Sequence, residues 1–137
     1  MVSRSTGRAL MVESNKNLLD PWRSKVTSEA RAMAQAIDWQ PIPSGAAVGV
    51  TISFIFNRPK NHFGTGKNSA VVKALAPRFP SSAPDIDKLT RAILDALTDA
   101  RVWADDGQVV WLKVSEHYVD QSWPSGEGVH VTLGVMK

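Results

Sequence analysis

Residues 84–110, PDIDKLTRAILDALTDARVWADDGQVV, contain the pattern that decides the fold. From Leu89 onward the apolar residues recur at helical spacing on one stripe, which predicts a helix ending near Arg101. The segment that follows, residues 109–118, predicts a β-strand. Four aspartates flank the predicted helix: Asp85, Asp87, Asp105 and Asp106.

Periodicity predicts the other elements on both sides of this stretch. Asp20 followed by Pro21 is typical of a helix start, and apolar residues at helical spacing after it predict a helix at about 21–38. Alternating apolar residues at 48–56 predict a strand with one strongly apolar face, and residues 129–135 predict another strand. Two helices and at least three strands, without regular alternation, indicate an α+β fold in which a mixed β-sheet carries two main helices on one face.

The composition is that of one ordinary globular domain, spanning residues 1–137, in which residues 1–19 are polar and weakly patterned. Apolar residues make up 43% and charged residues 21%, which argues against a disordered chain. The absence of cysteine excludes disulfides, zinc ribbons, thiolate catalysis and iron–sulfur clusters. No apolar run is long enough for a membrane helix or a signal peptide, so we expect a soluble, intracellular protein without a membrane partner.

The net charge of +3 is unevenly distributed. Residues 58–84 contain no acid and carry +5, whereas residues 85–108 carry −3. A connection of that length without clear periodicity is more often functional than idle. Basic patches attract phosphates, so we expect this loop to bind DNA. Its basic residues are Arg58, Lys60, Lys67, Lys73 and Arg78.

The aspartates suggest a site for a hard divalent cation. In an extended segment Asp85 and Asp87 would point to one side, and Asp87 is a plausible N-cap of the helix. If the helix and the next strand pack side by side, Asp106 returns close to that pair. Three converging carboxylates suit Mg²⁺ or Mn²⁺ and favour metal-assisted attack of water on a phosphodiester. Ordinary N-cap and turn chemistry would account for each aspartate taken separately.

Arg91 lies four residues after Asp87, on the same predicted helix face. It would hold a metal-bound carboxylate or contact the scissile phosphate; alternatively it is a solvent-exposed partner of Asp87 or Asp95. The three histidines share no spacing and are interpreted as structural.

Residues 84–110 resemble the signature of the RusA-type Holliday-junction resolvases, particularly those of phages and prophages. That pattern is Asp-x-Asp, a helix with a basic residue, and then Asp-Asp-x-Gln-Val. The segments DPWRSKV (20–26) and RPKNHFGTGKN (58–68) are also similar to the phage branch. The resemblance therefore spans about residues 20–119.

The resemblance implies a homodimeric α+β endonuclease that uses Mg²⁺ or Mn²⁺ to nick four-way junctions or related branched DNA during recombination and repair. It further implies that the protein acts in the cytoplasm of a bacterial or phage-infected cell. By position, Asp85, Asp87 and Asp106 match the metal-binding catalytic aspartates. Arg91 stands in place of a catalytic lysine, which removes a proton-donor role but retains phosphate stabilisation. Lys88 stands where asparagine is frequent and adds charge for DNA binding.

The resemblance carries one further expectation. Relatives usually open with a strand and a Pro-x-Pro-like turn, so this chain either starts late or dispenses with that strand.

Two other functions are compatible with the residues alone. One is a non-catalytic DNA-binding module that uses the 58–84 loop, and the other is a small metal-dependent phosphohydrolase acting on nucleotides.

Overall fold

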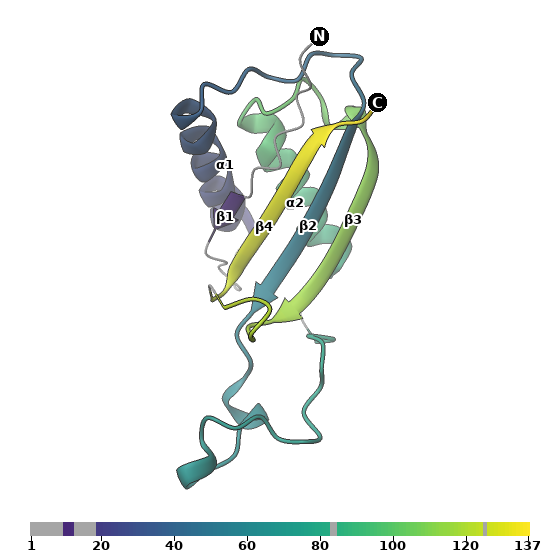
Figure 1. Ribbon diagram of the computed structural model, residues 1–137. Coiled ribbons are helices and arrows are strands. Elements are labelled where there is room, and N and C mark those ends of the chain that lie inside the picture. The colour runs from purple at the N-terminus through teal and green to yellow at the C-terminus, as the bar shows by residue number, and fades with distance from the viewer. Residues whose placement is uncertain (1–9, 13–18, 83–84, 125) are drawn as a thin grey trace.

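The structure is a computed structural model that describes residues 10–12, 19–82, 85–124 and 126–137. Its elements form one mixed sheet and one helical layer (Figure 1). In chain order they are β1 (Leu10–Val12), α1 (Leu19–Ala36), β2 (Val48–Phe56), α2 (Ile86–Asp99), β3 (Val109–Tyr118) and β4 (Gly128–Val135). Three short 3₁₀ helices are η1 (Lys60–His62), η2 (Gly66–Asn68) and η3 (Asp106–Gln108).

The sheet has the strand order β1-β4-β2-β3. β2 and β3 run parallel, whereas β4 is antiparallel to both β1 and β2. Both helices lie on one face of this sheet (Figure 1), α1 on the side of β1 and α2 on the side of β3. The predicted α+β class and the placement of two helices beside a mixed sheet are therefore confirmed.

The helical layer is held by apolar packing and by cross-helix hydrogen bonds. The alternating residues of β2 are buried as predicted, from Val48 at 0% exposure to Phe56 at 6%. Between the helices, the Thr27 hydroxyl donates to the Ala96 carbonyl at 3.4 Å, and Arg31 donates to the Asp99 carbonyl at 3.0 Å. The residue numbers of both partners rise together from the first contact to the second, so α1 and α2 run parallel.

Three local features differ from the sequence prediction. β1 is a strand within the segment that was expected to be unpatterned, and it pairs with β4. α1 begins at Leu19, ahead of the expected Asp20 cap. α2 begins at Ile86, so the residues around Asp85 and Asp87 belong to a helix start rather than to an extended segment.

Candidate active site

The N-terminal end of α2 presents the first two aspartates to solvent. Asp85 is the N-cap residue, although its side chain makes no capping hydrogen bond, and Asp87 lies in the first turn. The expectation that Asp87 is the N-cap is therefore wrong by two residues, because helical backbone begins at Ile86. Lys88 pairs with Asp85 at 3.7 Å between Nζ and Oδ2, with both side chains about two-thirds exposed. Carboxylates so placed are accessible to a cation or to a ligand from solvent.

Arg91 is exposed one helical turn beyond Asp87. Residues four apart on a helix share one face, so the guanidinium lies on the side that carries the Asp87 carboxylate. A fixed planar fork of N–H donors beside carboxylates is suited to binding a phosphate group. The observed helix is therefore compatible with the prediction that Asp87 and Arg91 lie on the same face.

Asp106 belongs to a turn that Gln108 fixes in place. The Gln108 Oε1 accepts from the backbone N–H of Ala104 at 3.0 Å and of Asp105 at 2.9 Å. Its Nε2 donates to the Pro43 and Ala46 carbonyls, at 2.8 and 3.0 Å, ahead of β2. The Asp105 side chain completes this capping box, which gives Asp105 a structural role. Asp106 itself remains exposed at the start of η3.

Within one chain, Asp106 lies at the opposite end of α2 from Asp85 and Asp87. The Asp106 turn sits beside the first residues of β2 and β3, at the end where α2 terminates. α2 begins at the other end of these parallel strands, and its 14 residues span about 21 Å at about 1.5 Å each. The expected return of Asp106 to the first pair therefore does not occur in a single chain.

The donor chemistry fits a hard divalent cation, but one chain supplies an incomplete set. Carboxylate oxygens are the ligands that Mg²⁺ and Mn²⁺ take together with water and phosphate. Among the described residues, no group of three His, Cys, Asp or Glu side chains could hold a metal ion. Asp85 and Asp87 supply two carboxylates at one helix end, and Asp106 lies at the other end of the same helix.

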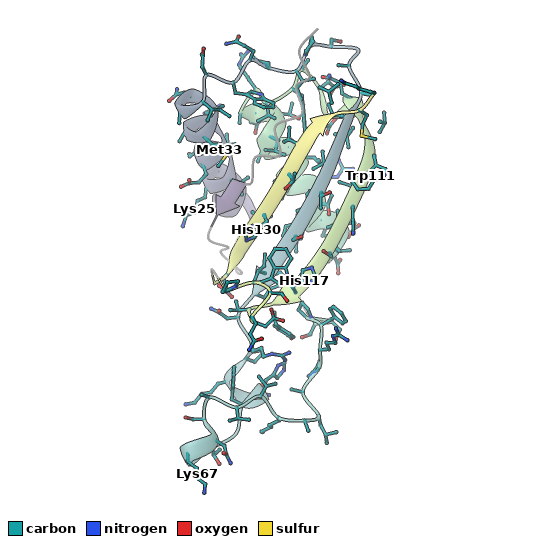
Figure 2. The ribbon with its side chains drawn as sticks, viewed as in Figure 1. Lys25, Met33, Lys67, Trp111, His117 and His130 are labelled. Carbon is teal, nitrogen blue, oxygen red and sulfur yellow. The ribbon has the colours of Figure 1, made fainter. Side chains whose placement is uncertain are left out.

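The basic segment forms an arm that projects beyond the end of the sheet (Figure 1). The arm is defined here as residues 57–82. Its two sides are joined by a bridge between Phe63 and Val72 and by backbone bonds from Gly64 to Val71 and from Lys73 to His62. Three lysines are exposed along it: Lys60, Lys67, which lies at its tip (Figure 2), and Lys73.

The two arginines of the arm make contacts inside the molecule. The Arg58 guanidinium lies 4.3 Å from the ring centre of Tyr118, donates to the Pro77 carbonyl at 2.7 Å and lies 3.3 Å from the His62 Nδ1. Arg58 therefore anchors the base of the arm to the end of β3. Arg78 lies over the Phe79 ring at 5.4 Å and stays exposed.

The comparison with known protein families covers nearly the whole chain. A protein-family model described as "Endodeoxyribonuclease RusA" matches residues 2–133. The chain belongs to this family. No curated protein matched the chain in a sequence search. Of the helices described, none has the length and apolar character needed to cross a membrane.

Glu116 is a buried carboxylate in β3 that the sequence analysis did not single out. It is level with the core residue Phe54 in the β2–β3 register, so it lies on the helix-facing side of β3. Burial raises the pKa of the Glu116 carboxyl, and its Oε2 is buried with no hydrogen-bond partner among the described residues. The alternation of side chains along a strand predicts that this side chain faces inward. Only the structure shows that this is the face of the sheet covered by the helices.

Aromatic rings cover the other face of the sheet at the same end. The Trp123 ring lies 4.9 Å from His117 of β3 and 5.1 Å from His130 of β4. These two histidines, labelled in Figure 2, belong to the strands on either side of β2. Burial lowers the pKa of both imidazoles, which favours their neutral form. Ser115 and His117 are joined by a 2.8 Å hydrogen bond. These contacts support the interpretation of His117 and His130 as structural.

Proposed function

We propose that this RusA-family chain is a divalent-metal-dependent endonuclease that cleaves four-way junctions or related branched DNA in recombination and repair. The observation that carries the proposal is the placement of Asp85 and Asp87 at the end of the molecule from which the basic arm projects. Family membership over residues 2–133 supports the nuclease chemistry. Such a protein would act in the cytoplasm of a bacterial or phage-infected cell, where branched DNA arises.

Asp85 and Asp87 would hold the cation, whereas Asp106, the third ligand expected from the sequence, lies at the other end of α2 in the same chain. A bound Mg²⁺ or Mn²⁺ supplies an activated water and stabilises charge on the phosphate oxygens. Arg91 would bind the phosphate that is cut, because its guanidinium stays charged and offers paired N–H donors. Lys88, paired with Asp85, adds positive charge where the DNA strand would pass.

The arm would supply affinity that does not depend on sequence. Lys60, Lys67 and Lys73 are exposed along it and have no acidic neighbours in sequence between residues 58 and 84. Lysines in such positions bind backbone phosphates and release counterions from the duplex. Arg58, which packs on Tyr118, positions the arm and contributes less to direct contact.

A non-catalytic DNA-binding module remains the second candidate function. It is favoured by the finding that the described residues of one chain gather no three-ligand metal group. In that case the arm alone carries the activity and the aspartates are turn and capping residues.

The test compares cleavage of a labelled four-way junction in Mg²⁺, Mn²⁺ and EDTA. We expect nicking in either metal and none in EDTA, while binding persists in EDTA. Asp87→Asn keeps the side-chain size and an oxygen acceptor but removes one negative charge. It should nearly abolish cleavage, leave metal-free binding equal or tighter, and leave thermal stability close to that of the parent. A parent protein that binds junctions but never nicks them supports the second candidate instead.

A further inference from the structure

The arm carries an apolar side chain that is almost fully exposed. Leu75 is 97% exposed, the highest value among the large apolar side chains that the structure describes. Val71, Val72 and Phe79 of the same arm are also exposed, at 56%, 41% and 54%. A single surface leucine is ordinary in a soluble protein. Leu75 differs from that case because its backbone is held in place and because the charges around it are all positive.

A tight turn presents Leu75 to solvent. The Ala76 N–H donates to the Lys73 carbonyl at 3.1 Å, which closes a turn that contains Leu75. The residues on either side of the leucine, Ala74 and Ala76, have only methyl side chains. The leucine side chain therefore extends from the turn without a bulky neighbour in sequence, and this narrow shape suits insertion between stacked groups.

Hydrogen bonds fix this turn to the rest of the arm on both sides. Ahead of the turn, the Lys73 N–H donates to the His62 carbonyl at 2.8 Å, across the arm. After the turn, the Pro77 carbonyl accepts from the Arg58 guanidinium at 2.7 Å. Arg58 is itself packed over the Tyr118 ring at the end of β3. Because the turn is already ordered, binding through it costs little additional conformational entropy.

The charges around Leu75 are complementary to those of a nucleic acid. Lys73 lies two residues before it and Arg78 three residues after it, both exposed, and residues 58–84 contain no acid. In a nucleic acid, negative phosphates flank stacked bases whose faces are apolar. Many DNA-binding proteins insert a leucine, phenylalanine or similar side chain between two bases while basic groups hold the backbone. An apolar side chain between two cations fits this kind of partner.

The chain connection limits how far Leu75 lies from the phosphate that is cut. Asp85 follows it by ten residues, which span at most about 36 Å when fully extended. One strand of duplex DNA advances about 3.4 Å per nucleotide. Bases that contact Leu75 therefore lie within about ten nucleotides of a phosphate bound at Asp85 and Asp87. In the proposed function that phosphate belongs to a junction, so this range includes the branch point.

We propose that Leu75 is a wedge that inserts between bases at the branch point of the DNA and unstacks them. This inference rests on the proposed function and adds how the arm distinguishes branched DNA from an intact duplex. Unstacking costs least where bases are already unpaired or distorted, so the wedge enters a branch point more readily than a continuous duplex. The lysines of the arm attract any DNA, and Leu75 adds the preference for branches.

Junctions that contain 2-aminopurine measure this unstacking directly, because the base fluoresces more strongly when it is not stacked. The probe is placed at the branch point and, in separate junctions, at positions up to about ten nucleotides away. Saturating protein in EDTA should raise the fluorescence at the branch point without cutting a strand. Leu75→Ala should lose most of this rise. Leu75→Met should keep it, because methionine fills a similar volume with flexible apolar atoms.

Two control variants separate the wedge from the charges of the arm. Leu75→Ala removes no charge, so its slope of log K against log salt should equal that of the parent, while its preference for junction over duplex falls. Lys67→Ala should lower the slope and weaken junction and duplex binding alike, and should keep the fluorescence rise at saturation. Met136→Ala, which removes a side chain 43% exposed just beyond β4, should change neither measurement.

The outcomes separate this inference from the proposed function. A parent protein that cuts junctions in Mg²⁺ but unstacks no probe overturns the wedge while the nuclease proposal stands, as does a Leu75→Ala variant that unstacks like the parent. Loss of unstacking in Leu75→Ala, with a parent that binds junctions but never nicks them, supports the wedge and overturns the nuclease proposal.

Two further results would assign Leu75 a different role and overturn the wedge. A lower salt slope for Leu75→Ala shows that the leucine shapes the arm and its lysines. A change in the sedimentation of DNA-free protein on the same substitution shows that the leucine packs against another protein chain.

Discussion

Removing the three exposed lysines of the arm should change how salt weakens DNA binding. The variant Lys60→Ala/Lys67→Ala/Lys73→Ala keeps the contacts of Arg58 at the base of the arm, so the arm should stay folded. Each lost phosphate contact on a duplex arm makes the slope of log K against log salt shallower by about 0.9, which gives about 2.7 for three contacts. Between about 50 and about 200 mM salt, the parent should therefore lose about 40-fold more affinity than the variant.

Fluorescence anisotropy with a labelled four-way junction in EDTA measures this slope without cleavage. The matched control compares two single variants, Lys67→Ala at the tip of the arm and Lys25→Ala on α1 (Figure 2). Both side chains are exposed, so the two substitutions remove the same charge from different surfaces. Lys67→Ala should lower the slope by up to about 0.9 and Lys25→Ala should leave it unchanged. Equal slopes in the parent and the triple variant would refute the assignment of the arm to DNA.

Substitutions at four other positions test single contacts. Arg91→Lys should retain part of the cleavage rate and Arg91→Ala much less, because lysine keeps the charge but loses the planar fork; a parent-like rate for the alanine variant argues against phosphate binding. Burial raises the pKa of Glu116 above 4.5, so ionisation costs the parent stability as pH rises through that pKa. In urea melts, Glu116→Gln should therefore gain stability over the parent from about pH 4 to about pH 7. Thr98→Val should cost about 1–3 kcal/mol on unfolding, because it removes the acceptor, 2.8 Å away, of the buried Trp103 indole N–H. Gly64→Ala should weaken DNA binding with little change in global melting, since an added Cβ would come within 2.8 Å of the backbone of the arm.

Local periodicity predicted the main elements because burial determines them residue by residue. The alternation in residues 48–56 places every second side chain in the core, and β2 has the predicted bounds. β3 also matches its predicted range, residues 109–118. β1 was missed because three residues are too few to show alternation, and its strand character comes from pairing with β4.

The start of α2 shows why capping is hard to predict when several candidates are adjacent. Asp85 and Asp87 are both acceptable N-cap types, and the sequence alone ranks neither above the other. The helix begins at Ile86, which leaves Asp85 as the cap position and places Asp87 within the first turn. A shift of two residues changes which way both carboxylates point, because side chains alternate along a strand but rotate around a helix.

The position of Asp106 could not be predicted from its neighbours in sequence. Asp105 and Asp106 have the same chemistry, yet Asp105 is bonded into the turn with Gln108 while Asp106 is exposed. The direction of the crossover from β2 to β3 determines which end of α2 the Asp105–Asp106 turn lies beside. Because β2 and β3 are parallel, the chain must return along α2 to the starting end of the sheet before β3 begins.

In the proposed function the lysines of the arm bind DNA, and the carboxylates at the start of α2 bind the metal. The lysines of the arm attract phosphates whether or not a cation is present, whereas carboxylates at the start of α2 repel them. In the proposed mechanism a cation at Asp85 and Asp87 changes the local electrostatic potential from negative to positive. The surface that repels DNA in EDTA would therefore bind a phosphate when the cation is present. DNA affinity in EDTA would then measure the contribution of the arm. Ca²⁺ binds carboxylates but supports cleavage poorly in a site suited to Mg²⁺, so the affinity that Ca²⁺ adds would measure the contribution of the carboxylates. Asp87→Asn should therefore tighten binding in EDTA and weaken the added effect of Ca²⁺, a pair of opposite changes that a purely structural aspartate would not produce.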